Sequence, residues 1–252
     1  MPAPRNELKA ALAAGRRMRG VWMNLGTETT AEIAGRAGFD WAVADGEHGP
    51  WDPTGLRRQL IALEGTGTAG VLRVPAAEDW IIKQALDLGA QTLLVPMIDS
   101  AAQAEAVVRA CRYPPEGVRG MGAAVARAGA YGAFTDYAET AAGELCIIVQ
   151  AESRAAMADL EAICAVDGVD GVFIGPADLG ADMGLRGEPD ADALWDEVLG
   201  GIRRIRKAGK AAGVLALSPH RQAQCAEAGA TFLGVASDAL LLQTALAEAA
   251  RQ

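Results

Sequence analysis

Charged side chains stand at the ends of short apolar runs or inside them, where a charge is costly to bury unless it meets a partner. Glu152 directly follows the run CIIVQA, Asp178 follows GVFI after a Gly-Pro-Ala linker, and Arg73 lies within GVLRV. Hard divalent cations such as Mg²⁺ and Mn²⁺ accept one or two carboxylates and leave positions for substrate oxygens and water. Glu152 and Asp178 are therefore candidate metal ligands, and a 2-oxo acid can chelate such an ion through its keto and carboxylate oxygens.

Two other interpretations of these carboxylates bear on that hypothesis. Zinc is disfavoured, because zinc sites usually contain several nitrogen or sulfur ligands, and no second histidine lies near Glu152 or Asp178. The four cysteines are scattered without a C-x-x-C pair, which is typical of buried free thiols. The second interpretation stays open: Glu152 could pair with Arg73 in a purely structural salt bridge.

His48 is one of only two histidines, and Asp45 precedes it by three residues at the end of another apolar run. Histidine is the usual general base near neutral pH, and a carboxylate can orient its imidazole. A lone histidine is more often structural, but a position beside the predicted metal carboxylates favours a catalytic role. Asp45 is then the candidate for orienting it. His220, in SPHRQ, is interpreted as a surface residue at the start of a helix.

The tetrapeptide Gly175-Pro176-Ala177-Asp178 opens a predicted helical turn after a further apolar run. Backbone N–H groups at the start of a helix can hold a carboxylate. The pattern is weak in isolation, and it gains weight because Asp178 is also a candidate metal ligand. Gln150 adds another polar side chain, two residues before Glu152.

The four lysines exclude one kind of aldol chemistry. Lys9, Lys83 and Lys207 belong to predicted helices or leads, and Lys210 precedes a predicted strand and so faces the other end of it. Schiff-base catalysis is therefore not expected. No G-x-S-x-G, H-E-x-x-H or P-loop motif is present, and no organic cofactor is expected.

Eight short apolar runs have the character of strands buried on both faces of a parallel sheet. Residues 30–37, 79–88, 101–111 and 194–207 have helical periodicity and lie between them. Eight strand–helix units with right-handed crossovers in about 250 residues predict a (β/α)₈ TIM barrel. The runner-up is an open doubly wound sheet, but its usual G-x-G-x-x-G motif is absent. The predicted strands are Gly20–Leu25, Trp41–Asp45, Gly70–Val74, Thr92–Pro96, Cys146–Ala151, Asp170–Ile174, Gly213–Leu217 and Phe232–Ala236.

The barrel prediction brings the polar residues together, because chemistry in such barrels lies at the C-terminal ends of the strands. Two stretches interrupt the strand–helix rhythm. Residues 112–122 are rich in proline and glycine and predict a loop, and residues 123–144 are interpreted as a lid-like excursion. Left-handed glycines are expected to end four helices just before a strand: Gly38, Gly89, Gly209 and Gly229.

Composition sets the broad class. The 252 residues are 51% hydrophobic and 22% charged, which suits a single domain over residues 1–252. The formal net charge of −9 disfavours nucleic acid as a partner. No apolar run reaches the roughly 18 residues of a membrane-spanning helix, and the N-terminus lacks the apolar core of a signal peptide. Unpaired cysteines are typical of a reducing compartment, so a cytoplasmic protein without a membrane partner is predicted.

Longer stretches of the chain carry a family resemblance. The sequence resembles the metal-dependent pyruvate aldolases of the HpcH/HpaI family, including its 4-hydroxy-2-oxoheptanedioate aldolases, from about residue 20 to residue 246. The resemblance implies a TIM barrel of the phosphoenolpyruvate/pyruvate type, in agreement with the strand count. The matching stretches are AGFDWAVADGEH (37–48), KQALDLGAQTLLVPM (83–97), RYPPEGVRG (112–120), VQAE (149–152) and DGVDGVFIGPADLGADMG (167–184).

The resemblance implies a role for each matched position. Glu152 and Asp178 correspond to the carboxylates that hold a divalent metal, which would be Mg²⁺, Mn²⁺ or Co²⁺. His48 corresponds to the catalytic base, acting directly or through a metal-bound water. Arg73 corresponds to the arginine that steadies the keto oxygen and the developing enolate.

The resemblance also implies contacts beyond this set. Asp87 matches an acid that reaches the histidine of a neighbouring subunit and raises its basicity, and Asp45 looks like a further partner of that histidine. Family members form trimers or hexamers, and the amphipathic segment 238–251 is expected to pack on a neighbour. The substrate-contacting positions are Gln150, Gly175, Pro176, Ala177, Asp178 and, on the aldehyde side, Leu215. The segment 123–140 and the stretch LALSPH depart from the family and are expected to shape the aldehyde pocket.

The implied function is that of a class II aldolase, which cleaves a 4-hydroxy-2-oxo acid reversibly to pyruvate and an aldehyde. The alternative within the same barrel group is a citryl- or malyl-CoA-type lyase, but so few lysines disfavour a coenzyme A site. A non-catalytic metabolite-binding barrel is the third hypothesis. Such a protein would be expected to lose His48, Arg73 or a metal carboxylate, and all of them are present.

Overall fold

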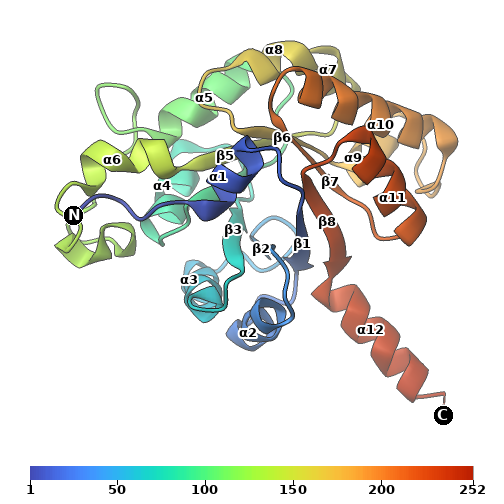
Figure 1. The fold of residues 1–252 in the computed structure, drawn as a ribbon, viewed down its shortest axis with the longest axis horizontal. Coiled ribbons are helices and arrows are strands. Elements are labelled where there is room, and N and C mark those ends of the chain that lie inside the picture. The colour runs from blue at the N-terminus through green and yellow to red at the C-terminus, as the bar shows by residue number, and fades with distance from the viewer. Residues whose placement is uncertain (252) are drawn as a thin grey trace.

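Eight parallel strands form the centre of the molecule. The computed structural model describes residues 1–251, and its strands close into a barrel in chain order, β1-β2-β3-β4-β5-β6-β7-β8 (Figure 1). This closure confirms the predicted (β/α)₈ barrel and excludes the open doubly wound sheet. The strands are β1 (Met18–Met23), β2 (Trp41–Asp45), β3 (Ala69–Arg73), β4 (Thr92–Val95), β5 (Cys146–Ala151), β6 (Gly171–Ile174), β7 (Ala211–Leu215) and β8 (Phe232–Ser237).

Six predicted strands match the structure to within one residue, whereas the first and the seventh begin two residues earlier than expected. In β1 the pairing with β8 already starts at Met18, opposite Phe232. In β7 the pairing with β6 starts at Ala211, opposite Gly171. Pairing with another strand determines where β1 and β7 begin. The apolar runs in the sequence do not show this pairing, so the predicted strands began too late.

Helices cover the outside of the barrel, and side-chain caps fix where several of them begin. Thr27 accepts a hydrogen bond from the Thr30 N–H at 3.1 Å, so the helix predicted from Thr30 begins at Glu28. The helices are α1 (Glu7–Ala13), α2 (Glu28–Arg36), α3 (Pro53–Leu63), α4 (Asp79–Asp87), α5 (Ala101–Cys111), η1 (Arg127–Gly132), α6 (Tyr137–Glu144), α7 (Arg154–Ala158), α8 (Leu160–Ala165), α9 (Pro176–Asp182), α10 (Asp192–Lys207), α11 (Pro219–Ala228) and α12 (Asp238–Ala249). The four glycines predicted to end helices all have left-handed backbones, with φ between 79° and 105°.

The interior of the barrel is filled by aromatic side chains from four strands. Trp41 stacks on Phe232 with ring centroids 3.9 Å apart, and Trp22 lies 5.3 Å from Phe173. Gly20 makes room for this layer, because a Cβ there would lie 2.0 Å from the Trp41 ring. The layer forms a packed floor beneath the C-terminal rim of the strands, where the predicted site residues lie.

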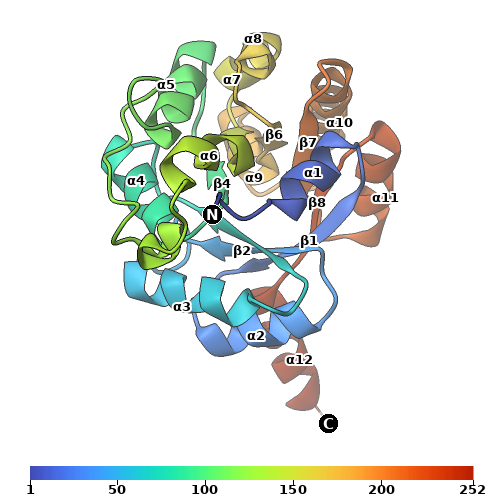
Figure 2. The same ribbon diagram turned by 60° about the vertical axis from the view of Figure 1, so that its left-hand side comes forward.

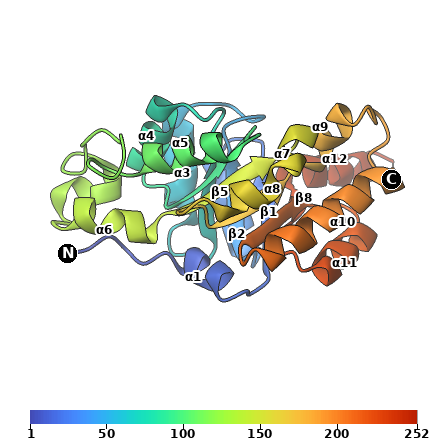
Figure 3. The same ribbon diagram turned by 90° about the horizontal axis from the view of Figure 1, so that it is seen from above.

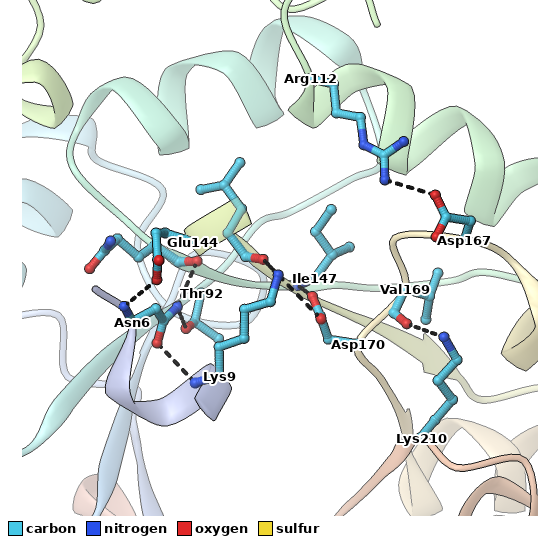
Figure 4. Close-up of polar contacts among 12 residues, drawn as sticks. Asn6, Lys9, Thr92, Arg112, Glu144, Ile147, Asp167, Val169, Asp170 and Lys210 are labelled. Carbon is cyan, nitrogen blue, oxygen red and sulfur yellow. Dashed lines mark hydrogen bonds and ion pairs between the residues drawn. The ribbon is translucent and has the colours of Figure 1, made fainter. Parts of the chain in front are cut away.

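Helix α1 closes the other end of the barrel. Leu8 and Leu12 pack into the same core as the aromatic layer. Lys9 donates a hydrogen bond to the Leu145 carbonyl at 2.5 Å and lies 3.4 Å from Asp170, which ties α1 to β5 and β6. Lys210 is also at this end, bound to the Val169 carbonyl (Figure 4). Half of the lysines therefore serve the closed end of the barrel.

The segment 123–144 does not cover the predicted site. It connects α5 to β5, and a helix-to-strand connection returns to the N-terminal end of the strands. Helix α6 packs there beside the N-terminus, where the Ala3 N–H donates to Thr140 Oγ1 at 2.8 Å (Figure 2). The interpretation of this segment as a lid, and as a wall of its own subunit's aldehyde pocket, is therefore wrong.

Helix α12 leaves the end of β8 and runs out from the rest of the molecule (Figure 1). The two chain termini lie at opposite ends (Figure 3). None of the residues of α12 is buried. Among residues 1–251, no helix combines the length and the apolar character needed to cross a membrane.

Candidate active site

A pocket of about 360 Å³ opens at the C-terminal rim of the barrel. Nine of the predicted site residues line it, and they come from strands, from the loops that follow them and from the first turn of α9. Two predicted residues, Asp45 and Asp87, do not line it. The lining residues are Trp22, Asn24, His48, Arg73, Gln150, Glu152, Phe173, Gly175, Pro176, Ala177, Asp178, Leu215, Leu217, Ser237, Ala239 and Leu240.

Arg73 is held by two carboxylates from the neighbouring strand end. Its Nε and Nη2 donate to the two oxygens of Asp45 at 2.8 and 2.7 Å, in a bidentate contact. Its Nη1 lies 2.7 Å from Glu47 Oε2. Both partners of Arg73 are thus acids of β2 and its loop, and the structural salt bridge with Glu152 that the sequence left open does not form.

Asp45 is the centre of a hydrogen-bond network that fixes this arginine. It is 1% exposed and also accepts a hydrogen bond from Asn24 Nδ2 at 2.5 Å. Asn24 in turn accepts one from the Ser237 hydroxyl at 2.9 Å. The network links the ends of β8, β1, β2 and β3, so the position of the guanidinium is set by four strands together.

Glu152 is also buried, and it forms no salt bridge with any lysine, arginine or histidine of residues 1–251. It is 3% exposed, and it accepts hydrogen bonds from the Met97 N–H at 2.7 Å and from Gln150 Nε2 at 2.7 Å. Burial raises the pKa of Glu152 to about 7, and the nearby Glu47 and Asp178 carboxylates add to that rise against the Met97 and Gln150 hydrogen bonds. A cation placed between Glu152 and Asp178 would relieve this repulsion.

Backbone conformation at two positions serves the Glu152 carboxylate. Met97 has a left-handed backbone, with φ at 59°, which is strained for a residue with a Cβ and aims its N–H at Glu152. On the other side, a Cβ at Gly175 would lie 2.5 Å from Glu152 Oε2. Glycine is therefore required where the carboxylate approaches the start of α9.

The side-chain oxygens of Glu152, Asp178 and Gln150 suit a hard divalent cation as ligands. Glu152 and the exposed Asp178 offer carboxylate oxygens, and Gln150 Oε1 is buried without a hydrogen-bond partner. Within residues 1–251, no group of three or more His, Cys, Asp or Glu side chains could hold a metal by itself. An ion on Glu152 and Asp178 would therefore complete its shell with substrate or water oxygens, as Mg²⁺ and Mn²⁺ commonly do.

His48 projects into the pocket from the loop after β2, and its side chain is exposed. Asp45 accepts a hydrogen bond from the His48 backbone N–H at 3.2 Å, and its carboxylate is occupied by Arg73 and Asn24. The prediction that Asp45 orients the imidazole is therefore corrected: Asp45 shapes the loop that carries His48 and fixes the arginine. His220 lies in the first turn of α11 and is exposed, as predicted.

Asp87 lies away from the pocket of its own subunit. It is the last residue of α4, at the N-terminal end of the barrel strands, and it pairs with Arg119 at 2.7 Å. Within one subunit, Asp87 lies at the N-terminal end of the strands and His48 at the C-terminal end, so the two side chains do not meet. The predicted role of Asp87 therefore requires a second copy of the protein.

Several residues that build the site were not predicted from the sequence. Asn24 and Ser237 follow or end strands, and a rule that counts every polar residue at a strand end would have found them. Trp22, on β1, lies under Arg73 with its ring centroid 5.7 Å from the guanidinium carbon. Leu240 belongs to α12, and no local pattern places that helix at the pocket.

Similarity to known proteins covers nearly the whole chain. A family model described as HpcH/HpaI aldolase/citrate lyase matches residues 18–245. The chain is 53% identical to the hydroxypyruvate/pyruvate aldolase of Agrobacterium fabrum, over 94% of this chain and 90% of that protein. The crystal structure of an HpcH/HpaI aldolase/citrate lyase family protein from Burkholderia cenocepacia has a TM-score of 0.93 and 36% identity, over 98% of both chains.

A more distant structure shares the fold alone. The citrate lyase β subunit of Mycobacterium tuberculosis, complexed with oxaloacetate and magnesium, has a TM-score of 0.61 and 16% identity, over 90% of this chain and 93% of that one. The chain is therefore more similar, in fold and in sequence, to the Burkholderia protein than to this lyase subunit.

Proposed function

Because this chain belongs to the HpcH/HpaI aldolase/citrate lyase family of carbon–carbon lyases, we propose that it is a class II aldolase, dependent on a divalent metal. In the proposed reaction a 4-hydroxy-2-oxo acid is cleaved reversibly to a 2-oxo acid and an aldehyde. The observation that carries the proposal is the buried Glu152 beside Asp178, without a cation from the chain, in the same pocket as Arg73.

Glu152 and Asp178 are the residues that would hold the metal. A bound divalent cation would act as a Lewis acid on a substrate that chelates it through keto and carboxylate oxygens. Mg²⁺, Mn²⁺ and Co²⁺ are the candidates. The lyase subunit from M. tuberculosis, complexed with magnesium and the 2-oxo acid oxaloacetate, supports this pairing of metal and substrate class.

The chain's own residues supply the remaining steps. In the cleavage direction His48 accepts the proton of the 4-hydroxyl group, the C3–C4 bond breaks, and its electron pair forms the enolate of the departing 2-oxo acid. Arg73 places positive charge beside the enolate oxygen as its negative charge grows. The N–H groups of Ala177 and Asp178, in the uncapped first turn of α9, can hold the substrate carboxylate. Protonation of the enolate at C3 then forms the 2-oxo acid, and this proton balances the one that His48 accepted from the hydroxyl group, so the reaction takes up no proton overall.

The pocket walls suggest where each product lies. The name of the A. fabrum relative supports pyruvate or hydroxypyruvate as the 2-oxo product. Leu215 and Leu217 line both this pocket and a neighbouring cavity of about 610 Å³, whose other lining residues include Leu185 and Trp195. We assign the aldehyde to this side. Arg73 is the one lysine or arginine among the described residues that line the site, which disfavours a coenzyme A thioester as substrate.

Removal of the metal tests the proposal. Exhaustive treatment with EDTA is expected to abolish the release of pyruvate from 4-hydroxy-2-oxo acids, because Glu152 and Asp178 alone supply no Lewis acid. Adding back Mg²⁺, Mn²⁺ or Co²⁺ should restore it. Release is measured by coupling pyruvate to NADH oxidation. Undiminished activity after chelation, with the residual metal content verified, would contradict the assignment.

The proposal includes a homotrimer or homohexamer, in which α12 packs on a neighbour and Asp87 reaches the histidine of another subunit. The leucines of α12 support it. Leu240, Leu241, Leu242 and Leu246 are between 48% and 61% exposed, on a helix that has no buried residue. A helix of this length gains its stability from packing, so this apolar surface requires a partner.

Charge placed on this helix is expected to break the assembly. The double substitution Leu242→Glu and Leu246→Glu should lower the mass measured by light scattering to that of a smaller species, because two carboxylates cannot be buried there without cost. Thr244→Glu, on the same helix, is the matched control and should retain the wild-type mass. A wild-type protein that is monomeric at micromolar concentration would exclude the oligomer.

A further inference from the structure

A buried arginine binds one of the proposed catalytic acids, at the end of the barrel opposite the pocket. The side chain of Arg119 is 0% exposed, and its Nη2 donates a hydrogen bond to Asp87 Oδ1 at 2.7 Å. The guanidinium carbon lies 4.6 Å from the centroid of the Tyr113 ring and 5.8 Å from that of Tyr137. Two aromatic rings and one carboxylate therefore hold this cation in place.

Among the described residues, Asp87 is the carboxylate that forms an ion pair with Arg119. Its Nε and Nη1 are buried without a hydrogen-bond partner among the described residues. Burial lowers the pKa of the Arg119 guanidinium, but Tyr137, Asp87 and Tyr113 outweigh that effect and raise it. The side chain therefore stays charged, and Asp87 is its ion-pair partner.

Asp87 keeps part of its carboxylate at the surface. Its side chain is 27% exposed, and it shares a face of α4 with the exposed Trp80, seven residues earlier. The segment after Arg119 runs along this helix, and a Cβ at Gly122 would lie 3.3 Å from Asp87 Oδ2. The exposed Met121 belongs to the same segment, between Arg119 and Gly122. An acid amid exposed apolar side chains suits a contact with a second copy of the chain.

We propose that Arg119 is a positioning residue for Asp87: it holds Oδ1 so that Oδ2 points outward, toward His48 of a neighbouring subunit. This inference rests on the proposed aldolase function and on the trans role of Asp87. A carboxylate at the end of a helix has several rotamers, and only some of them would reach across an interface. The ion pair with Arg119 selects one of these rotamers before the subunits meet, which is the advantage of a preorganised group.

The test measures kcat and KM for pyruvate release in the full-length, metal-loaded protein. D87N and R119Q are each expected to lower kcat by roughly tenfold to a hundredfold, the usual range for supporting residues. The KM for the 2-oxo acid should stay unchanged, because neither residue lines the pocket. The double variant R119Q/D87N should be no slower than D87N, since Arg119 has nothing left to position. R119K should recover most of the rate, because the contact uses one donor.

Two further variants separate positioning from general damage. Arg127 ties the same segment to the same helix end, through the Leu88 carbonyl at 3.0 Å, and does not bind Asp87. R127Q is therefore the matched control and should retain the wild-type kcat. D87E keeps the charge and the partner of Arg119 but moves the carboxylate by one methylene, so it should lose kcat as D87N does, even if R119Q does not fold.

The outcomes distinguish this inference from the proposed function. A wild-type protein without aldolase activity overturns both. An active wild type with a normal kcat in D87N or D87E overturns the positioning role of Arg119. The proposed aldolase function is then unaffected. Losses in R119Q and D87N that multiply in the double variant show that Arg119 acts independently of Asp87, and they also overturn the inference.

Discussion

Arg73→Lys is expected to lower kcat for retro-aldol cleavage by about 10²- to 10³-fold, the range seen when one preorganised electrostatic donor is removed. Lysine keeps the charge but lacks the planar fork of arginine, which here binds both oxygens of Asp45 and contacts Glu47 at the same time. The ammonium can satisfy only part of this arrangement, so the charge beside the enolate is displaced. Steady-state kinetics of pyruvate release measure the effect.

Lysine is the better test than alanine, because alanine would leave the buried Asp45 without its cation. Breaking a buried ion pair in that way costs about 3–5 kcal/mol of stability, which would confuse a loss of folding with a loss of catalysis. Arg36→Lys, on the exposed face of α2, is the matched control and should change neither kcat nor the melting temperature. A near-normal kcat in Arg73→Lys would show that the position of this charge does not matter to the reaction.

Most of the residues predicted for the site line one pocket, because a parallel barrel brings the C-terminal ends of its strands together. Arg73, Glu152 and Asp178 each lie at or after the C-terminal end of an apolar run, and closure of the sheet brings all such ends to one rim. The helix-ending glycines were equally predictable, because the left-handed turn before a strand is a local requirement.

The partners of Asp45 could not be read from the sequence in the same way. Proximity along the chain suggested His48, but Asp45 is the direct register partner of Arg73 between β2 and β3. Register depends on how two distant strands align, and a shift of one residue would have sent the two side chains to opposite faces. The contact of Asn24 with Ser237 depends likewise on the closure of β8 against β1, which includes a register shift after Gly20.

Segment 123–144 was misplaced for a topological reason. Its length and its tyrosines suggested a functional loop, and long loops often are functional. Its position after a helix and before a strand assigns it to the opposite end of the barrel, whatever its composition. Arg119 lies in the stretch 112–120 that carries the family resemblance, but no role was predicted for it, because its burial depends on Tyr113, Tyr137 and α4 together.

The Glu152 carboxylate carries the second large effect. It combines burial, two neighbouring carboxylates and hydrogen bonds only from neutral donors, so the chain stabilises its charge poorly. The raised pKa means that ionised Glu152 costs stability in the metal-free protein. The cost develops as the pH rises from the ordinary carboxyl range toward about 7, and it persists above that. A residue kept under these conditions is expected to serve a cation.

Glu152→Gln should therefore separate catalysis from stability. The amide keeps the size of the side chain and can still accept the Met97 N–H, but it removes the charge that would hold the metal. We expect retro-aldol activity to fall by at least about 10³-fold, as electrostatic stabilisation worth several kcal/mol is lost. At pH 8 without metal, the melting temperature should rise or stay level, because an uncompensated buried charge is gone. Kinetics and thermal unfolding measure the two effects.

The effect of added metal on thermal stability tests whether Glu152 binds the ion. Added Mn²⁺ should raise the melting temperature of the wild type, because an ion that binds only the folded state stabilises it, and this increase should vanish in Glu152→Gln. Glu139→Gln removes a charge from the exposed face of α6 and should behave as the wild type in both measurements. If Glu152→Gln keeps its activity, or keeps the stabilisation by Mn²⁺, the metal is held elsewhere, and the buried carboxylate needs another explanation.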